Sequence, residues 1–416
     1  MRRRLTRSLG VIVLLAASFA APADEYAAAR AELVAAYQGQ DYPAMVVAAG
    51  KALAARPNHP GAGFNLALAH SLAGNHAVAL DVLEDLLASG IDFGIEGMDE
   101  FAGVREGPGW DAFMERVEVL RAPTGSAETA LAFPDGQFIP EGIAVDASGS
   151  IYLGSIRKGL LVRGDEVLSD RQGHWSVFGM RFHEDGSLWF ASAAVAQLEE
   201  VGDDLGKTGL FRLDVSTGDI THAALLPQLA EEQVLGDLII DGNSIYTTDS
   251  LTGGVYRYDI ATDAFTTLLE PGLLRSPQGL VLDAAGEHLY VANYSDGLYR
   301  VSVTSGEAER VPVSGAATDY GIDGLYRSGK RLIAIQNGIR PHRVTAFELS
   351  DDGTRIVGSQ VLAANLPAFD EPTLGALHGD SLYFVANSHW NRFDRDNSLP
   401  EGLSGPIVLK LDLDHE

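Results

Sequence analysis

The residues from about Glu128 to Glu416 repeat one three-part pattern six times. Each copy begins with a short apolar run, continues after a turn with a second apolar run, and ends with a strand that usually opens on glycine. The first runs begin at Gly142, Gly179, Asp237, Gly279, Gly324 and Gly375, at spacings of 37, 58, 42, 45 and 51 residues. This is the period of an antiparallel propeller blade. The sequence therefore predicts a mainly β fold, a six-bladed β-propeller, over residues 128–416.

Residues 24–122 have a different pattern, with alanine and leucine at helical spacing. The predicted helices are Glu25–Gln38, Tyr42–Ala55, Ala62–Ala73, His76–Ser89 and a last one at Trp110–Leu120. A shift of 35 residues superposes Gly39 on Gly74, so the segment resembles a pair of tetratricopeptide (TPR) repeats. We expect a TPR-like domain that docks on the propeller or recruits a protein or peptide partner. Residues 123–127 are the predicted linker.

Residues Met1 to Ala23 have the composition of a secretory signal: a basic start, an apolar stretch and a small-residue cleavage site. The apolar stretch is too short to span a bilayer, and no later one qualifies. The chain has no cysteine, so its stability outside the cytoplasm would rest on its core alone. We expect a periplasmic or secreted protein.

The chain is strongly acidic. The predicted signal holds four arginines and no acidic residue, so removing it leaves 26 Lys and Arg against 57 Asp and Glu, a formal charge of −31. Nucleic acid is excluded as a partner, because phosphate binding depends on clustered Lys and Arg. The excess charge favours cations as ligands, or serves only to keep the surface solvated.

Propeller geometry predicts a site at one end of the central channel. The innermost strand of each blade starts there, so the residue just before each first apolar run should point into a common funnel. Glu141, Gln278 and Asp323 occupy this position in blades 1, 4 and 5. Carboxylate and amide oxygens are the ligands that calcium prefers. We expect these three to hold Ca²⁺ or another divalent cation, with Asp237 as a further ligand or as a residue that fixes its own loop.

The second strand of each blade should end on the same face. Asp249, Asn293 and Asn337 recur at intervals of 44 residues, and with Asn387 and Trp390 we expect them to contact substrate. A bound divalent ion would polarise an ester or lactone carbonyl, and Asp323, His174 or His389 would supply acid or base catalysis. A loop histidine can instead serve only as a hydrogen-bonding group. The long connections Ala193–Lys207 and Ala224–Leu235 are candidates for a lid.

At these residues the chain resembles the gluconolactonase, senescence-marker-protein and luciferin-regenerating-enzyme family. The phrases FIPEGIAVD, SPQGLVLD, GIDGLYRSG and IYTTDS carry the resemblance. It implies a mouth ion held by a glutamate in blade 1, asparagines in blades 3 and 4 and an aspartate in blade 5. Glu141 and Asp323 match the first and last positions, whereas Gly236 and Gln278 stand at the asparagine positions.

Two functions follow from these patterns. One is a metal-dependent lactonase or esterase that acts on a small molecule in the funnel, and the retained Glu141 and Asp323 favour it. The other is a non-catalytic binding propeller whose helices and rim hold a peptide, glycan or protein, and the loss of a side chain at Gly236 favours it.

Overall fold

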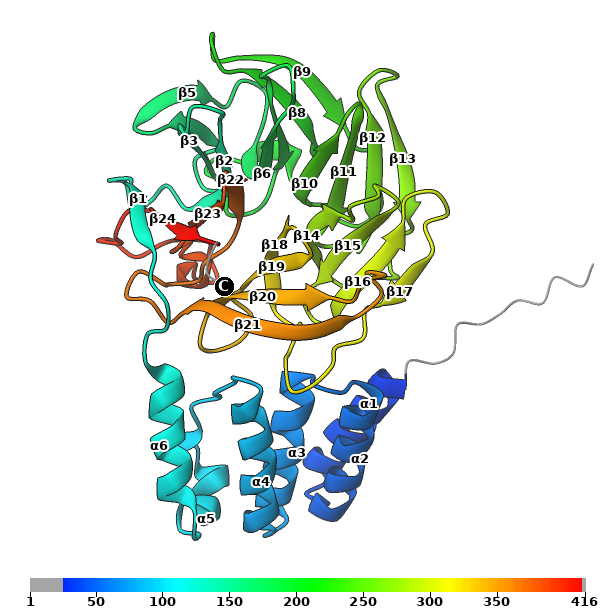
Figure 1. The fold of residues 1–416 in the computed structure, drawn as a ribbon, viewed down its shortest axis with the longest axis vertical. Coiled ribbons are helices and arrows are strands. Elements are labelled where there is room, and N and C mark those ends of the chain that lie inside the picture. The colour runs from blue at the N-terminus through cyan, green and yellow to red at the C-terminus, as the bar shows by residue number, and fades with distance from the viewer. Residues whose placement is uncertain (1–24, 414–416) are drawn as a thin grey trace, which may run out of the picture.

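The protein is described by a computed structural model that covers residues 25–413; the predicted signal segment, Met1–Ala23, lies outside this range. The described residues form six four-stranded antiparallel sheets arranged around one axis, preceded by a group of helices (Figure 1). The prediction of a six-bladed propeller is confirmed. Among residues 25–413, no helix is long and apolar enough to cross a bilayer.

In blades 1 to 5 the strands are arranged in chain order, from the innermost strand at the central channel to the outermost strand. Blade 1 consists of β2 Pro140–Val145, β3 Ile151–Ser155, β4 Leu160–Arg163 and β5 Glu166–Asp170. Blade 2 consists of β6 Ser176–Phe182, β7 Leu188–Ala193, β8 Thr208–Asp214 and β9 Asp219–Leu225. Blade 3 consists of β10 Leu235–Asp241, β11 Ser244–Asp249, β12 Val255–Asp259 and β13 Ala264–Leu269. Blade 4 consists of β14 Pro277–Leu282, β15 His288–Asn293, β16 Gly297–Ser302 and β17 Ala308–Arg310. Blade 5 consists of β18 Ile322–Ser328, β19 Arg331–Gln336, β20 Arg343–Leu349 and β21 Ile356–Ala364.

Blade 6 joins the two ends of the propeller. Its inner strands are β22 Gly375–His378, β23 Ser381–Val385 and β24 Ile407–Asp412, and its outer strand is β1, Glu128–Ala132. Glu128 pairs with Lys410 and Ala132 with Ile407. The three-part repeat did not predict this closure, because it shows only the three inner strands of each blade. The outer strands are shorter or more exposed and their residues follow no common pattern.

Apolar side chains pack between neighbouring blades and hold the ring together. One cluster joins Tyr152 and Leu161 of blade 1 to Met180 and Phe190 of blade 2. The next joins Trp189 of blade 2 to blade 3 across a layer of aromatic and aliphatic residues. Burial between blades, rather than within one blade, makes each sheet dependent on its neighbours.

Five of the six helices among residues 25–413 agree closely with the predicted ranges, and the short α5, at Ala102–Arg105, was not predicted. The six helices are α1 Glu25–Gln38, α2 Tyr42–Ala55, α3 Pro60–Leu72, α4 His76–Ala88, α5 Ala102–Arg105 and α6 Trp110–Arg121, with short 3₁₀ turns at Ile95–Gly97, Asp99–Phe101, Gly202–Asp204 and Trp390–Arg392. The main difference is at α3, which begins two residues earlier than expected. Pro60 occupies the first turn, where its missing N–H costs nothing, and the His59 side chain accepts from Ala62 N. Each of α1 to α4 packs against the next.

The helices dock beside blades 4 and 5 (Figure 1). Arg56 forms an ion pair with Asp296, in the connection from β15 to β16. Arg343 of β20 donates to the carbonyl of Gly90 (2.9 Å). In the predicted linker, Thr124 pairs with Ala364 at the end of β21. These propeller segments lie on the face where the inner strands begin, so the helices flank the mouth of the channel.

We expect Asp296→Asn to lower the free energy of unfolding by about 2–4 kcal/mol, because it removes a carboxylate from a mostly buried ion pair. The side chains of Arg56 and Asp296 are 14% and 9% exposed. The measurement is denaturant unfolding followed by circular dichroism, with hydrogen exchange on α1–α3 to locate the loss. Asp351→Asn is the control, since its pair with Lys330 is fully solvated and should contribute nothing measurable. Equal stability of the two variants would contradict the docking role of Arg56 and Asp296.

Candidate functional site

One pocket of about 510 Å³ lies where the inner strands begin; we call it the mouth pocket. All six residues that precede the first apolar runs line it: Glu141, Phe178, Gly236, Gln278, Asp323 and Leu374. In blades 1 to 5 the pairing of the first two strands shifts register at this position. A β-bulge re-aims a side chain that would otherwise lie against the sheet. The bulges therefore turn these residues toward the channel.

The glycines that follow the mouth residues allow the inner strands to converge. A Cβ on Gly142 would lie 2.1 Å from the carbonyl oxygen of Phe178 in the next blade. A Cβ on Gly279 would lie 2.4 Å from the backbone nitrogen of Leu325. Any side chain at these positions would force neighbouring blades apart at the mouth.

Glu141 and Asp323 are buried carboxylic acids that face the same pocket, with exposures of 7% and 8%. Trp390 Nε1–H donates to Glu141 Oε2 (2.7 Å), and Asn337 Nδ2–H donates to Asp323 Oδ2 (2.7 Å). Burial, and then the nearby charge of Asp323, hold the pKa of Glu141 well above its usual range. Burial raises the pKa of Asp323 to about 7, against the lowering effect of Asn337. The pocket therefore contains two acids that resist being ionised together.

A third acid, Glu371, enters the mouth pocket from the connection between β21 and β22. Its Oε2 accepts from Asn391 N (2.8 Å), and burial raises its pKa. Its backbone has φ 63°, and Ile139, just ahead of Glu141, has φ 47°; both are uncommon for residues other than glycine. Sequence reasoning missed Glu371 because it considered only the residue next to each inner strand. The acidic pair Asp370-Glu371 in that connection was the available signal.

Asp249, Asn293 and Asn387 do not reach the mouth pocket. Asp249 accepts from the backbone nitrogen of Val234 (3.0 Å), Asn293 from that of Ser276 (3.0 Å) and Asn387 from that of Ile407 (2.7 Å). In blades 3 and 4 the bond fixes the segment that leads into the inner strand, whereas in blade 6 it fixes the start of β24. The structure thus gives these three residues a positioning role in place of the expected substrate contact.

Asn337 does line the mouth pocket, because it stands one residue further along its blade. Strand pairing matches Asp249 with Leu235, Asn293 with Pro277 and Gln336 with Ile322. Asn337 therefore corresponds to Ser250 and Tyr294, which also line the pocket, and the equal intervals of 44 residues conceal a shift of one. A step of one residue turns a side chain to the opposite side of the strand. Tyr294 donates its hydroxyl to Asn337 Oδ1 (2.9 Å).

The two candidate histidines lie outside the mouth pocket. His174 is buried against Phe190 and Phe211 and bonds the carbonyl of Gly159 (2.9 Å). Burial lowers the pKa of His174 to about 4, so it is neutral near pH 7. His389 is buried between Asp370 (3.4 Å) and the carbonyl of Ser404 (3.1 Å). Neither ring is placed to exchange a proton with a ligand in the pocket, whereas Trp390, the next residue, does line it.

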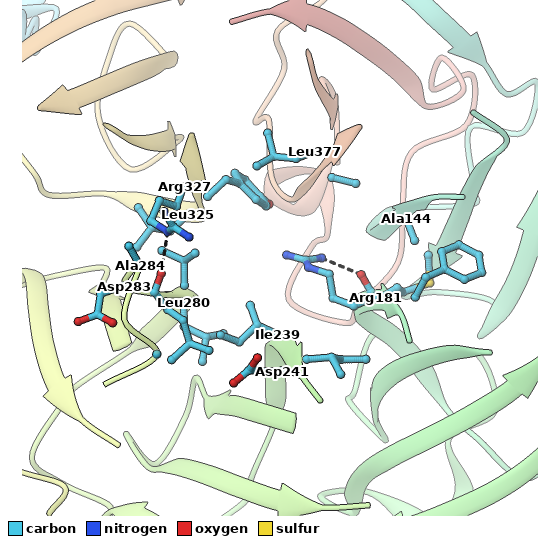
Figure 2. A pocket seen from close by; sticks show the side chains of 18 of the residues that line it. Ala144, Arg181, Ile239, Asp241, Leu280, Asp283, Ala284, Leu325, Arg327 and Leu377 are labelled. Atoms are coloured by element: carbon cyan, nitrogen blue, oxygen red, sulfur yellow. Dashed lines mark hydrogen bonds between the residues drawn. The ribbon is translucent and has the colours of Figure 1, made fainter. Parts of the chain in front are cut away.

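Asp237 lies deeper in the channel and is 1% exposed. Both of its carboxylate oxygens are 3.3 Å from Arg181 Nη2, and Leu238 N donates to Oδ1 (2.8 Å). Arg181 belongs to a second pocket, of about 650 Å³, at the far end of the inner strands. Figure 2 shows its guanidinium reaching toward the middle of that pocket. This ion pair lies between the two pockets. The Asp237 carboxylate therefore already has a cationic partner.

The mouth pocket offers oxygen donors of the kind that a hard cation takes. Gln278 Nε2–H donates to Ser276 Oγ (2.9 Å), which leaves the amide oxygen of Gln278 available beside Glu141 and Asp323. Within residues 25–413, no three Asp, Glu, His or Cys side chains lie close enough to hold one ion. The lining of the mouth pocket thus includes two carboxylic acids and one amide oxygen, groups that a divalent cation can bind together with water. The oxygen donors of the mouth pocket are therefore of the chemical kind that a hard cation binds.

Two long connections form one wall of the mouth pocket. Ala194, Val195, Ala196, Gln197 and Gly206 come from the connection in blade 2, and Glu232, Gln233 and Val234 from the connection that leads into blade 3. These are the segments that were expected to form a lid.

No family model and no curated protein matches this sequence. Among solved structures, the PQQ-bound aldose sugar dehydrogenase of Streptomyces coelicolor is 14% identical, with a TM-score of 0.49 over 70% of this chain and 99% of that one. The calcium-binding protein regucalcin of Agrobacterium tumefaciens is 17% identical, with a TM-score of 0.47 over 68% and 93%. A putative glucose dehydrogenase of Thermus thermophilus is 15% identical, with a TM-score of 0.46 over 69% and 100%. At such values these matches carry no argument about the activity of this chain.

The raised pKa of Asp323 predicts a pH dependence of stability in metal-free protein. Between about pH 4 and 7 the folded protein holds a proton on Asp323 that the unfolded chain releases, so stability falls as the pH rises through this range. Asp323→Asn removes this contribution. We expect the variant to gain on the wild type by an amount on the order of a few kcal/mol from pH 4 to 7. Thermal unfolding in EDTA across this range is the measurement, and a constant difference between the two proteins would refute the assignment.

Alanine substitutions of Asn293 and Asn337 should have different effects, the first on stability and the second on the pKa of Asp323. Asn293→Ala removes the acceptor of two part-buried hydrogen bonds, from the backbone N–H groups of Arg275 and Ser276, so we expect a loss of about 1 kcal/mol of stability. Asn337→Ala removes the hydrogen bond that favours ionised Asp323, so the pKa of Asp323 should rise further. Unfolding and carboxyl titration by ¹³C NMR test both. An unchanged Asp323 titration in Asn337→Ala would contradict the expectation.

Proposed function

We propose that this protein hydrolyses an ester or lactone in the mouth pocket, and that a divalent cation, calcium first among them, binds there to Glu141, Gln278 and Asp323. The observation that carries the proposal is the pair of buried acids, Glu141 and Asp323, facing one pocket with raised pKa values. Buried acids with strongly shifted pKa values in a pocket are typical of functional sites. Burying them there costs stability, and a purely structural role does not account for that cost.

The hydrogen bonds around Asp323 prepare it for proton transfer. Tyr294 donates to Asn337, and Asn337 donates to Asp323 Oδ2, which fixes the carboxyl and leaves Oδ1 without a hydrogen bond from residues 25–413. In the metal-free pocket the pKa of Asp323 is about 7. A bound divalent cation would lower this pKa, so Asp323 would be an ionised carboxylate able to accept a proton near neutral pH. In the proposed reaction a water adds to the carbonyl carbon and gives its proton to Asp323. The same proton passes to the departing alkoxide when the bond between carbonyl carbon and alkoxy oxygen breaks.

The remaining residues of the mouth pocket position the acids and shape the pocket for its ligand. Trp390 fixes the Glu141 carboxyl through its indole N–H, and Phe178 and Leu374 exclude water from one side of the pocket. A divalent cation, when bound, would stabilise negative charge on the carbonyl oxygen. We further propose that the protein works in the periplasm or is secreted, and that α1–α4 are a TPR-like pair, which their serial packing supports.

A second candidate is a binding propeller without catalysis. Two observations favour it: position 236 has no side chain, and the described residues provide no group of three acids or histidines close enough for one ion. In that case the mouth pocket would recognise a ligand and leave it unchanged.

The proposal is tested by calcium titration calorimetry on EDTA-treated, desalted protein, with a panel of esters and lactones assayed on the same samples. We expect Glu141→Gln and Asp323→Asn each to weaken calcium binding by at least about tenfold, because each removes one of two carboxylate ligands. Hydrolysis should fall in parallel. Asp241→Asn is the matched control, since this exposed acid lines the pocket at the far end of the channel.

Each result separates the alternatives. Parallel loss in the two mouth variants, with Asp241→Asn unchanged, supports the hydrolase. Calcium binding without turnover of any substrate supports the binding propeller. No binding, with hydrolysis still dependent on Asp323, would refute the metal and keep the acid-base role.

A further inference from the structure

The lining of the mouth pocket is acidic. Five acids line it: Glu141, Glu232, Asp237, Asp323 and Glu371. A bound cation would favour their ionised forms, which burial disfavours. None of the described residues that line it is lysine, arginine or histidine. Within the pocket wall no cation offsets the acids, and only Asp237 is matched, by Arg181 from the other side of the channel.

Glu371 stands apart from the acids proposed to hold a metal ion. Its neighbour Asp370 pairs with Arg392 (2.8 Å) and lies 3.4 Å from His389, whereas Glu371 forms no ion pair among residues 25–413. Burial and the charge of Asp370 raise the pKa of Glu371, and the charge of Arg340 opposes them without a direct ion pair. The φ of Glu371 is 63°, in the left-handed region, which is strained for a residue other than glycine. Such strained residues are common at ligand-binding sites.

Aromatic rings surround the same part of the pocket. Trp390 and Phe178 have ring centroids 6.5 Å apart at an interplanar angle of 31°, and both line the pocket with Tyr294. Asn391, which follows Trp390, holds the Glu371 carboxylate by its backbone N–H. The charge of Glu371 also acts on the Tyr294 hydroxyl. Glu371 thus shares the pocket with three aromatic side chains, of which Trp390 also donates to Glu141. We call Glu371, Trp390, Tyr294 and Phe178 the aromatic subsite.

This chemistry separates organic from inorganic cations. Calcium takes six to eight oxygen ligands, and the aromatic subsite supplies one carboxylate and one phenol, whose hydroxyl donates to Asn337. An alkylammonium group needs one counter-charge and the faces of aromatic rings. A pocket of about 510 Å³ has the size of a small-molecule site. An anionic ligand would meet the acids with no base to offset them.

We propose that the ligand of the mouth pocket is an organic cation, an amine or quaternary ammonium joined to an apolar body, held at the aromatic subsite by Glu371. The inference rests on the proposed function only for the reactive part of the ligand: the substrate class is then an ester or lactone of an amino alcohol or amino acid. Binding of the cation itself does not depend on hydrolysis.

The test uses three small probes of similar size on EDTA-treated full-length protein: benzyltrimethylammonium, benzyl alcohol and phenylacetate. Calorimetry should show benzyltrimethylammonium binding at least about tenfold more tightly than the alcohol, with phenylacetate weakest. Glu371→Gln keeps the acceptor for Asn391 N–H and removes the charge, so it should abolish most of the preference. Glu232→Gln removes the same charge from the exposed side of the same pocket and should change the affinity by no more than about twofold. Thermal unfolding checks that both variants fold.

Two results would overturn the inference. One is equal affinity of the wild type for the cationic and anionic probes, which needs no variant. The other is an equal effect of Glu371→Gln and Glu232→Gln, which would show a diffuse field and no subsite. Hydrolysis of phenyl acetate and acetylcholine by the same proteins, assayed with calcium added back, separates the two proposals. Cation binding that depends on Glu371 without hydrolysis supports this inference and refutes the hydrolase, and hydrolysis without preference for the cationic ester does the reverse.

Discussion

The pairing of β1 with β24 is the constraint on which the rest of this molecule depends. A propeller buries apolar surface between blades, so an open ring would leave two blade faces in water. Closure fixes the sixth blade against the first and thereby fixes the diameter of the channel. The mouth pocket exists only in the closed ring, because its six lining positions come from six different blades. Glu141 and Asp323 are far apart in sequence, and closure brings them to the same pocket.

Closure also explains why the acids at the mouth are energetically unusual. Each inner strand converges with the others, and the bulges of blades 1 to 5 turn the mouth residues into a small shared volume. Where that side chain is an acid, it loses hydration and gains a neighbour of like charge. Trp390 and Asn337 offset part of this cost by hydrogen bonding. A proton or a cation offsets the rest, which connects the fold directly to the chemistry we propose.

The sequence predicted the residues at the start of the inner strands, and it misjudged some of those at the end of the second strand and in the loops. The glycines and prolines at the start of each inner strand mark the mouth positions, so Glu141, Gln278 and Asp323 could be placed. Asn293 was expected to line the pocket, but its side chain is buried against the segment before β14. Its position in its strand differs by one residue from that of Asn337. The equal spacing of the two residues does not show at which residue each strand ends. His174 and Glu371 depend on the path of a connection, which follows no repeat. Helix boundaries were accurate, apart from the start of α3, because alanine-rich repeats and their turns are local signals.

The docking of the helices on blades 4 and 5 has a consequence for the order in which the chain is made. Arg56 and Asp296 lie 240 residues apart. At the usual pace of about 5–20 residues per second, the ribosome needs on the order of ten seconds or more to deliver the partner of a helical segment that is already complete. During that interval the docking face of the helices is exposed, and β1 likewise has no partner until Asp412 is in place. The helices and β1 are therefore the segments that wait longest for their partners. A chain cut short before β24 would keep an open strand edge, a feature by which quality-control proteases and chaperones recognise unfinished proteins.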